Sequence, residues 1–238
     1  MWEELSTIGV KPYYKDESVF IIHADCRDVL PLLPLGYISL VLTDPPYGIS
    51  YESGRYKGIN PWGSISGDDA WPEDVLQMCR IIARVGVLAF CRWDVKHKQK
   101  PDSLIVWVKN SWTAGDLEHE YARSWEAIAW WKGPLHQWAA TRPSDVILNS
   151  RVAPTALHHP TEKPVELLEK LIQQHKRSTV LDPFMGSGST LRAAKNLGLK
   201  AVGVEIEERY CEIAALRMKQ EVLQHAPAAD SHKQGGLY

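Results

Sequence analysis

The sequence lacks cysteine pairs, long hydrophobic runs and an excess of charge of either sign. No C-x-x-C pair occurs, so neither a zinc site nor a disulfide framework is expected. No run approaches the ~18 apolar residues of a membrane-spanning helix. The first ten residues contain Glu3 and Glu4 and no apolar stretch, so they are not expected to form a signal peptide. We expect a cytoplasmic protein without a metal and with four reduced thiols: Cys26, Cys79, Cys91 and Cys211.

The charge balance excludes a surface that is basic all over. Lys and Arg number 27 against 29 Asp and Glu, giving a net charge of −2, so any face that binds nucleic acid must be local. The remaining composition, 45% hydrophobic and 24% charged over 238 residues, is that of ordinary globular proteins. At roughly 150 residues per domain, this length favours one large α/β domain.

Apolar runs and helical periods alternate along the chain. The runs 19–25 and 38–44 are rich in β-branched residues, and each ends in an aspartate, as buried parallel strands of a βαβ unit do. Further strands are expected at 86–91, 104–109, 124–132, 178–184 and 200–205. Helices are expected at 27–35, 72–83, 163–175 and 207–223, and a further helix is expected after the segment 186–190, ending at about 197. This order predicts an α/β fold with a doubly wound, mostly parallel sheet.

Two segments without an apolar period interrupt this order. Residues 48–72 are rich in Gly, Ser, Tyr and Pro, which predicts a long, functional loop. Residues 133–157 are predicted to be irregular and to face the substrate. Seven of the ten tryptophans lie between Trp93 and Trp138. Both core packing and a base-stacking surface are compatible with them.

The stretch Asp182-Pro183-Phe184-Met185-Gly186-Ser187-Gly188 predicts a strand that runs into a glycine turn and a helix. Glycines let the backbone approach a ligand closely, and Glu205, at the end of the next strand, suits the two hydroxyls of a ribose. A third glycine at dinucleotide spacing and a P-loop are both lacking, which disfavours NAD and ATP. The pattern therefore indicates a nucleoside cofactor.

A second motif, Asp44-Pro45-Pro46-Tyr47, stands at a strand's carboxyl end, where open α/β sheets bind their ligands. The Asp44 carboxylate and the Pro45 carbonyl could accept hydrogen bonds from an exocyclic amine of a nucleobase and stabilise it as charge develops during attack. Tyr47 offers a flat face for an extruded base. No cysteine follows a proline, so the covalent chemistry of cytosine-ring methylation is not indicated.

With these motifs the chain resembles the β-class of S-adenosylmethionine-dependent DNA amino-methyltransferases, which modify adenine N6 or cytosine N4. The catalytic motif of that class matches 44–47 and its cofactor motif matches 182–190. The class is circularly permuted, with the catalytic motif first, and this sequence has that order. Residues 159–164, 23–26, 107–110 and 126–132 resemble further family segments, so the likeness covers about 19–218. It implies a Rossmann-like methyltransferase fold with a C-terminal antiparallel hairpin in the sheet.

The resemblance also implies roles for individual residues. It makes Asp44, Pro45, Pro46 and Tyr47 catalytic. It makes S-adenosylmethionine the cofactor and S-adenosylhomocysteine the product, without a metal. The residues it assigns to cofactor binding are Asp25, Cys26, Asp44, Thr161, Lys163, Asp182, Phe184, Gly186, Ser187, Gly188, Thr190 and Glu205.

The expected activity is site-specific methylation of adenine N6 in double-stranded DNA, because Asp at the first motif position goes mostly with adenine within the family. Cytosine N4, RNA and protein-amide methylation stay open as alternatives, as does a non-catalytic module that binds cofactor or DNA. A homodimer and a cognate restriction endonuclease are also open partners, and the source would be a prokaryote or a phage. The DNA contacts are predicted at local basic residues: Arg55, Lys57, Arg142 and Arg151.

One catalytic domain is expected over 1–225, with a mobile loop at 48–72, a small target-recognition insertion at 133–157 and a disordered tail at 226–238. The sequence departs from the family pattern in two places. The linker 92–103 is too short for the expected crossover helix, so the sheet edge there is predicted to be thin or covered by a partner subunit. The insertion 133–157 is small for reading a long DNA site.

Overall fold

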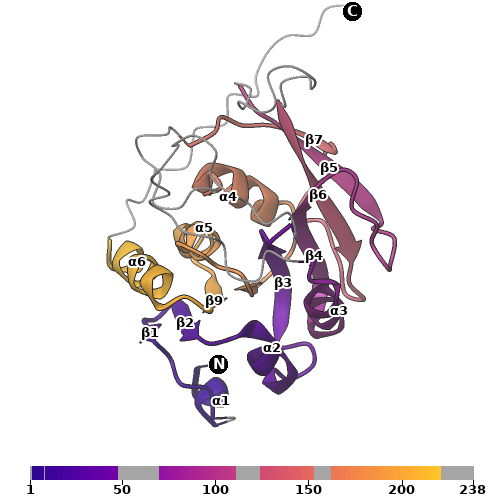
Figure 1. Ribbon diagram of the computed structural model, residues 1–238. Helices are drawn as coiled ribbons and strands as arrows, with labels where there is room; N and C mark the ends of the chain where they lie inside the picture. The colour runs from indigo at the N-terminus through magenta and orange to yellow at the C-terminus, as the bar shows by residue number, and fades with distance from the viewer. Residues whose placement is uncertain (1, 8, 48–69, 111–123, 153–161, 221–238) are drawn as a thin grey trace, which may run out of the picture.

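The computed structural model describes residues 2–7, 9–47, 70–110, 124–152 and 162–220 (Figure 1). Within them, one mixed nine-stranded sheet has the order β1-β2-β9-β8-β3-β4-β6-β5-β7. Its strands are β1 (Tyr14–Lys15), β2 (Val19–His23), β3 (Ile38–Thr43), β4 (Ala83–Cys91), β5 (Ser103–Val108), β6 (Trp125–Lys132), β7 (Val146–Leu148), β8 (Thr179–Asp182) and β9 (Lys200–Glu205).

Helices cover both faces of this sheet (Figure 1). On one face lie α4 (Val165–Gln173), α5 (Ser189–Asn196) and α6 (Glu208–Lys219), and on the other lie α1 (Trp2–Thr7), α2 (Cys26–Val29), the 3₁₀ turn η1 (Leu30–Leu32) and α3 (Glu73–Ile82). Successive strand residues point to opposite faces. Ile21 therefore packs under α4–α6, whereas its neighbours Phe20 and Ile22 pack on the α1–α3 side.

The predicted doubly wound α/β fold is confirmed. Strands β2, β9, β8, β3 and β4 pair in parallel, and β6 runs antiparallel between β4 and β5. The expected antiparallel pair is thus present, but it lies in the middle of the chain rather than near its C-terminus. The permuted order explains this position, because the half of the sheet that carries the pair precedes the half that carries the glycine turn.

Three expectations about local structure need correction. Residues 133–157 are not irregular throughout, since β7 pairs in parallel with β5 and forms the sheet edge beside it. The edge is therefore made by the insertion and not left thin by the linker 92–103. The helix expected over 27–35 is broken into α2 and η1, because Pro31 lies in the first turn of the 3₁₀ segment and cannot continue α2. Helix α1 and strand β1 were not predicted.

The order in which the chain adds strands to the sheet reverses between the parallel neighbours β3 and β8. From β8 it proceeds to β9 on one side, and from β3 it proceeds to β4 on the other. The loops that leave two such strands diverge, which opens a crevice at their carboxyl ends. Both sequence motifs follow these strands directly, because Asp44 comes after β3 and Asp182 ends β8.

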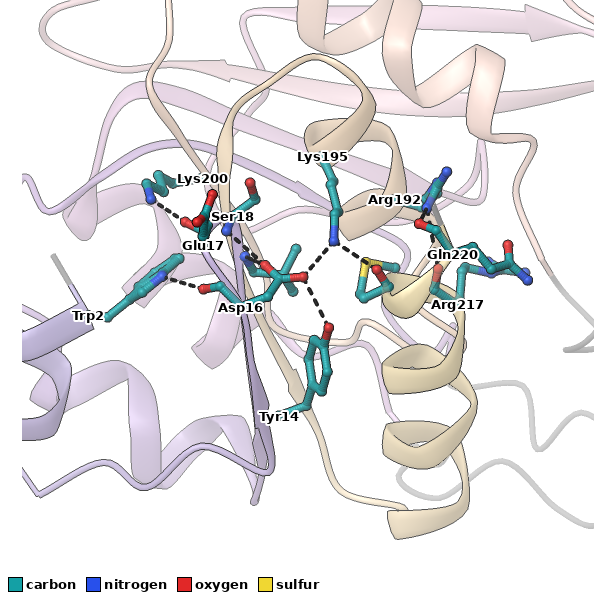
Figure 2. A network of polar contacts seen from close by, with 12 residues as sticks. Trp2, Tyr14, Asp16, Glu17, Ser18, Arg192, Lys195, Lys200, Arg217 and Gln220 are labelled. Carbon is teal, nitrogen blue, oxygen red and sulfur yellow. Dashed lines mark hydrogen bonds and ion pairs between the residues drawn. The ribbon is translucent and has the colours of Figure 1, made fainter. Parts of the chain in front are cut away.

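A polar network around Asp16 ties the first strands to the C-terminal helices (Figure 2). One Asp16 oxygen accepts from the backbone N–H groups of Ser18 and Val19, each at 2.7 Å. The other accepts from Lys195 Nζ at 2.5 Å and from the Tyr14 hydroxyl at 3.1 Å. Lys195 also donates to the carbonyl of Met218 in α6 at 2.7 Å. The carboxylate thereby holds β1, β2, α5 and α6 in one arrangement.

Replacing Asp16 by alanine is expected to lower the free energy of unfolding by about 3 kcal/mol, because it leaves two backbone donors without their acceptor and the Lys195 ammonium without its carboxylate partner. Partial burial alone would raise the pKa of Asp16, but Lys195 and the backbone donors outweigh burial and hold that pKa below its usual value. The stabilisation is therefore present above the usual aspartate pKa and is lost as the pH falls through the lowered one. Urea unfolding at several pH values measures both effects.

Glu17→Ala is the matched control for this prediction, because the neighbouring Glu17 side chain is exposed and only its backbone carbonyl accepts from Lys200. Its stability should stay within about 0.5 kcal/mol of the parent protein at every pH. Equal stability losses in the two variants, or an acid dependence that Asp16→Ala leaves unchanged, would contradict the assigned role of the network.

Candidate functional site

A cavity of about 530 Å³ opens at the carboxyl ends of the parallel strands. Its wall contains the turn after β3, the end of β8 and the segments that follow β2 and β9. Because β6 runs antiparallel to β4 and β5, the start of β6 lies at the same edge as the end of β5. Glu126 and Lys109 therefore also line the cavity.

The Asp44 carboxylate is held from two sides. Tyr47 donates its hydroxyl proton to Oδ1 at 2.7 Å, and Lys163 Nζ donates to Oδ2 at 2.6 Å. Lys163 immediately precedes Pro164, the N-cap of α4. The start of this helix therefore positions the Lys163 ammonium next to the turn that follows β3. The Tyr47 ring stacks on Trp71 with centroids 6.5 Å apart and lines the cavity with Pro45 and Pro46.

The ion pair continues beyond Asp44. Lys163 Nζ also lies 3.4 Å from Oε2 of Glu126, and Glu126 Oε1 accepts from Lys109 Nζ at 2.5 Å. The side chains of Lys163 and Lys109 are only 8% and 5% exposed, so both ammonium groups are enclosed in protein. Lys163 also lies above the Phe90 ring, 4.9 Å from its centroid. Positive and negative charges thus alternate in the order Asp44, Lys163, Glu126, Lys109.

Burial and charge act against each other in this row. Burial raises the pKa of Asp44 and Glu126 adds to the rise, while Lys163 and Tyr47 oppose it and the net pKa stays above its usual value. Burial also raises the pKa of Glu126, but Lys163 and Lys109 outweigh it, so that this pKa is lowered. Burial lowers the pKa of Lys163, yet Asp44 and Glu126 outweigh burial and raise it. Lys163 is therefore protonated at neutral pH.

Asp182, at the end of β8, is the buried carboxyl of the glycine motif. Its Oδ1 accepts from the Thr43 hydroxyl at 2.7 Å and from the Phe184 N–H at 3.1 Å, and Thr190 also donates to it. Burial raises its pKa to about 6, against these hydrogen bonds and with a small addition from Asp44. Thr43 and Asp182 join the strands β3 and β8, so they fix the two motifs relative to each other.

The glycine turn is shaped by close packing as well as by its backbone angles. Gly186 and Gly188 have φ of 50° and 81°, in the left-handed region that other residues rarely adopt. A Cβ atom on Gly188 would lie 2.9 Å from the Cβ of Ala214 in α6. Gly188 is also the N-cap of α5, so a helix contact and the turn both require a glycine there.

Glu205 closes the turn from the end of β9. Its Oε2 accepts from the Gly186 N–H at 2.9 Å and its Oε1 from the Glu207 N–H at 2.8 Å. Burial raises the pKa of Glu205 and these backbone donors oppose the rise. Each carboxylate oxygen keeps a second lone pair, which two neighbouring hydroxyls of a ligand could use.

Most residues singled out from the sequence come together at this cavity. Besides those described above, its wall contains Asp25, Cys26, Phe184, Ser187 and Thr190. Asp25 is the N-cap of α2 and accepts from the Arg27 N–H at 2.8 Å. Gly188 does not line the wall among the described residues. Thr161, Arg55 and Lys57 lie outside the described residues.

The two described arginines assigned to DNA contact lie apart from each other. Arg142 is exposed on the segment that enters β7, whereas Arg151 is half-buried on the segment that leaves it. Because β7 is parallel to β5, Arg151 comes after the strand end that faces the cavity, and Arg142 comes before the opposite end. The structure therefore does not gather them into one basic patch.

Five of the described tryptophans lie either in the core or at the cavity. Trp107, Trp130 and Trp131 are buried in the core. Trp93 and Trp125 are 65% and 41% exposed and line the cavity.

Sequence reasoning gave no role to Lys109, Glu126 or Thr43. The signal that could have found them is their position, since each stands at the end or start of a strand at the edge where the motifs lie. Within the described ranges, no group of three or more His, Cys, Asp or Glu side chains could hold a metal ion. In the same part of the chain, no helix has the length and apolar character required to cross a bilayer.

The strand order, the cavity at the switch point and the two motifs define an α/β enzyme of the nucleoside-cofactor type. A family model described as DNA methylase matches residues 94–216, and the chain belongs to this family of N6 and N4 DNA methylases. The expected relationship to the DNA amino-methyltransferases is thereby confirmed. S-adenosylmethionine is the methyl donor of the family, as the resemblance implies.

Individual relatives agree with this assignment. YubD of Escherichia coli (strain K12) is 29% identical over 88% of this chain and 95% of its own length. The type II methyltransferase M2.DpnII of Streptococcus pneumoniae is 27% identical over 89% of this chain and 93% of its own.

Solved structures share the fold. The crystal structure of the M1.HpyAVI–SAM complex has a TM-score of 0.59 and 24% identity, covering 84% of this chain and 99% of that one. The cytosine-N4-specific PvuII DNA methyltransferase has a TM-score of 0.67 and 16% identity, covering 89% and 90%.

The cavity suits the cofactor of the family. A volume of about 530 Å³ lies in the range of small-molecule sites. Asp44, Asp182 and Glu205 all face the cavity, and carboxylates attract a positively charged sulfonium. Glu205, held by two backbone donors, has lone pairs that could accept from a ribose diol, and Phe184 adds an apolar wall.

Proposed function

We propose that this protein is a site-specific DNA methyltransferase that methylates the N6 amine of adenine in duplex DNA after the base is flipped out of the helix. The observation that carries the proposal is the joining of the two motifs in one cavity. The turn at Asp44 and the turn at Gly186 meet across strands β3 and β8, so an amine and a methyl donor could be held side by side.

In this proposal Asp44 and Pro45 act on the target amine. Each oxygen of Asp44 uses one lone pair for Tyr47 or Lys163 and keeps another for an N–H group of the amine. The Pro45 carbonyl accepts the second N–H. These acceptors stabilise the nitrogen as it becomes tetrahedral and gains positive charge. S-adenosylmethionine would supply an electrophilic methyl group: its sulfur–methyl bond breaks as the bond from the amine nitrogen forms, S-adenosylhomocysteine leaves as a neutral thioether, and the methylated amine loses one proton. No covalent bond between enzyme and base is therefore required.

Tyr47 and Pro46 would shape the place of the extruded base. A base stacked on the Tyr47 ring gains about 1–3 kcal/mol, which offsets part of the cost of leaving the duplex. Trp93 and Trp125 provide further aromatic surface at the cavity. Cofactor contacts are assigned to Asp25, Cys26, Phe184, Ser187 and Glu205 from the wall of the cavity, together with the other residues named from the motifs.

Adenine is favoured over cytosine because the catalytic motif begins with Asp44. Cytosine N4 is the alternative that one comparison supports, since a structural neighbour is named as cytosine-N4-specific. The type II relative favours a site-specific enzyme with a cognate restriction endonuclease. We also propose that residues 1–225 form one catalytic domain, that the enzyme acts in the cytoplasm, and that Arg55, Lys57, Arg142 and Arg151 contact DNA. A homodimer would be compatible with this activity.

Product analysis tests the proposed function. The purified protein is incubated with labelled S-adenosylmethionine and unmethylated duplex DNA, and the digested DNA is examined by nucleoside mass spectrometry. N6-methyladenine is the expected product, and sequencing of modified positions would identify the target site. N4-methylcytosine would instead establish the alternative. If neither modified nucleoside is found although cofactor binding is intact, the proposal of DNA methylation is overturned. A binding module or an RNA substrate would then be favoured.

A further inference from the structure

The proposed function uses Asp44 but gives no task to Glu126 and Lys109, and it includes Lys163 only as a cofactor contact named from the motifs. Lys163, Glu126 and Lys109 come from the start of α4, from β6 and from the end of β5, so three separate elements are brought to one carboxylate. The ammonium of Lys163 lies between two carboxylates, at 2.6 Å from Asp44 and 3.4 Å from Glu126. Such a convergence of buried charge costs desolvation energy, which calls for a function.

The groups that face Asp44 determine its protonation. Lys163 and the Tyr47 hydroxyl lie in direct contact, Glu126 lies behind Lys163, and Asp182 acts from β8 across the cavity. Lys109 lies further from Asp44 and forms an ion pair with Glu126. Without Lys163, the three carboxylates would face one another with Lys109 as the remaining cation of the row. Like charges in a poorly solvated site favour uptake of a proton.

We propose that Lys163 is a positioning residue for methyl transfer, which orients the Asp44 carboxylate and keeps it ionised at neutral pH, while Glu126 and Lys109 hold Lys163 in place. This inference rests on the proposed function of Asp44 as acceptor for the target amine. It assigns Lys163 a task that is distinct from contact with the cofactor, and it assigns Glu126 and Lys109 to the same device.

The ionised form of Asp44 matters for the chemistry. A carboxylate offers acceptors only, whereas a protonated carboxyl replaces one acceptor by an O–H donor and binds an N–H group more weakly. A lone Lys163 would also cancel much of the negative charge that should face the amine. Glu126 restores that charge because it pairs with the same ammonium. The row of two carboxylates and two ammonium groups therefore fixes Asp44 without leaving an uncompensated positive charge beside it.

Four variants test the proposal: Lys163→Met, Lys163→Arg, Glu126→Gln and the double variant Lys163→Met with Glu126→Gln. Single-turnover methyl transfer is measured from about pH 5 to pH 9 with saturating cofactor and duplex DNA. For Lys163→Met we expect a rate at least about ten-fold below that of the wild type on the acidic side, with much of the loss recovered at alkaline pH. Lys163→Arg should keep most of the wild-type profile, since it retains the charge.

The double variant provides the discriminating result. Removing Glu126 takes away one of the like charges that Lys163 offsets, so the acidic limb of the profile should move back toward that of the wild type. Lys170→Met is the matched control, because Lys170 lies on α4 and pairs with Glu166 outside the cavity. It should leave the profile unchanged.

A second readout does not need activity. The carboxyl carbon of Asp44 is followed by NMR in the ¹³C-labelled, substrate-free protein, with the resonance assigned by its loss in Asp44→Asn. Its titration midpoint should rise in Lys163→Met and fall back in the double variant. If the wild-type protein transfers no methyl group, the proposed function fails, and this titration still decides whether Lys163 keeps Asp44 ionised.

Two outcomes would overturn the inference. One is a Lys163→Met profile that is lower by the same factor at every pH, with an unchanged Asp44 titration, since a merely structural role predicts that. The other is a loss confined to cofactor affinity, measured by equilibrium binding, which would make Lys163 a cofactor-binding residue only.

Discussion

Replacing Asp44 by alanine is expected to lower the rate of methyl transfer by about 10³-fold, the size of effect seen when one preorganised electrostatic contact is lost from an active site. The variant lacks the carboxylate that Tyr47 and Lys163 hold toward the cavity. The target amine would then lose an acceptor at the moment when it develops positive charge. Single-turnover transfer to duplex DNA, followed by nucleoside analysis, measures the loss.

Two further variants make this prediction specific. Asp44→Asn keeps one carbonyl oxygen and should fall between the wild type and Asp44→Ala. Asp28→Ala removes an exposed carboxylate from α2 and should transfer methyl groups at the wild-type rate. Circular dichroism and thermal unfolding show whether each variant is folded. If folded Asp44→Ala methylates DNA as fast as the wild type, the role assigned to Asp44 is wrong.

The second large effect is expected at Gly188. Replacement by alanine forces a side chain into a backbone with φ of 81° and brings its Cβ within 2.9 Å of Ala214. The two penalties together should lower the free energy of unfolding by about 3 kcal/mol. Because Gly188 is the N-cap of α5, a shift of this helix should also weaken cofactor binding. Denaturant unfolding and equilibrium binding of S-adenosylmethionine measure the two effects.

Gly198 is the matched control, since its φ is 68° and no atom would lie within 4 Å of an added Cβ. Gly198→Ala should cost only the backbone strain, about 1 kcal/mol, and leave cofactor affinity unchanged. Combining Gly188→Ala with Ala214→Gly should restore part of the affinity by relieving the contact. Equal losses for Gly188→Ala and Gly198→Ala would show that the packing against α6 is unimportant.

Local sequence signals were sufficient for most of the fold. Runs such as 38–44 and 200–205 are buried on both faces along most of their length, so apolar residues predominate in them and the strands are evident. Strand β7 was not predicted because it has only three residues, two of them exposed. It forms by pairing with the edge of β5, which the local sequence does not reveal. Likewise, α1 and β1 are short elements that depend on tertiary contacts.

The candidate site was partly predictable for a related reason. Asp44, Asp182 and Glu205 stand at strand ends that the sequence reveals, and the motifs named their neighbours. Glu126 and Lys109 could not be placed, because their meeting depends on β6 running antiparallel between β4 and β5, and no spacing in the sequence encodes that neighbour relation. The contact between Lys163 and Asp44 spans 119 residues and likewise depends on the three-dimensional arrangement.

The central pairing of β3 with β8 has a consequence for how the protein is made. Ser39 and Thr179, which are joined by a hydrogen bond at this seam, are 140 residues apart in the chain. During synthesis the ribosome completes β3 long before β8, so one edge of a strand that is wholly buried in the folded protein remains unpaired until β8 is made. Closing so long a loop costs entropy before its contacts form, which slows folding. The crevice that joins both halves of the site is therefore among the last features to form.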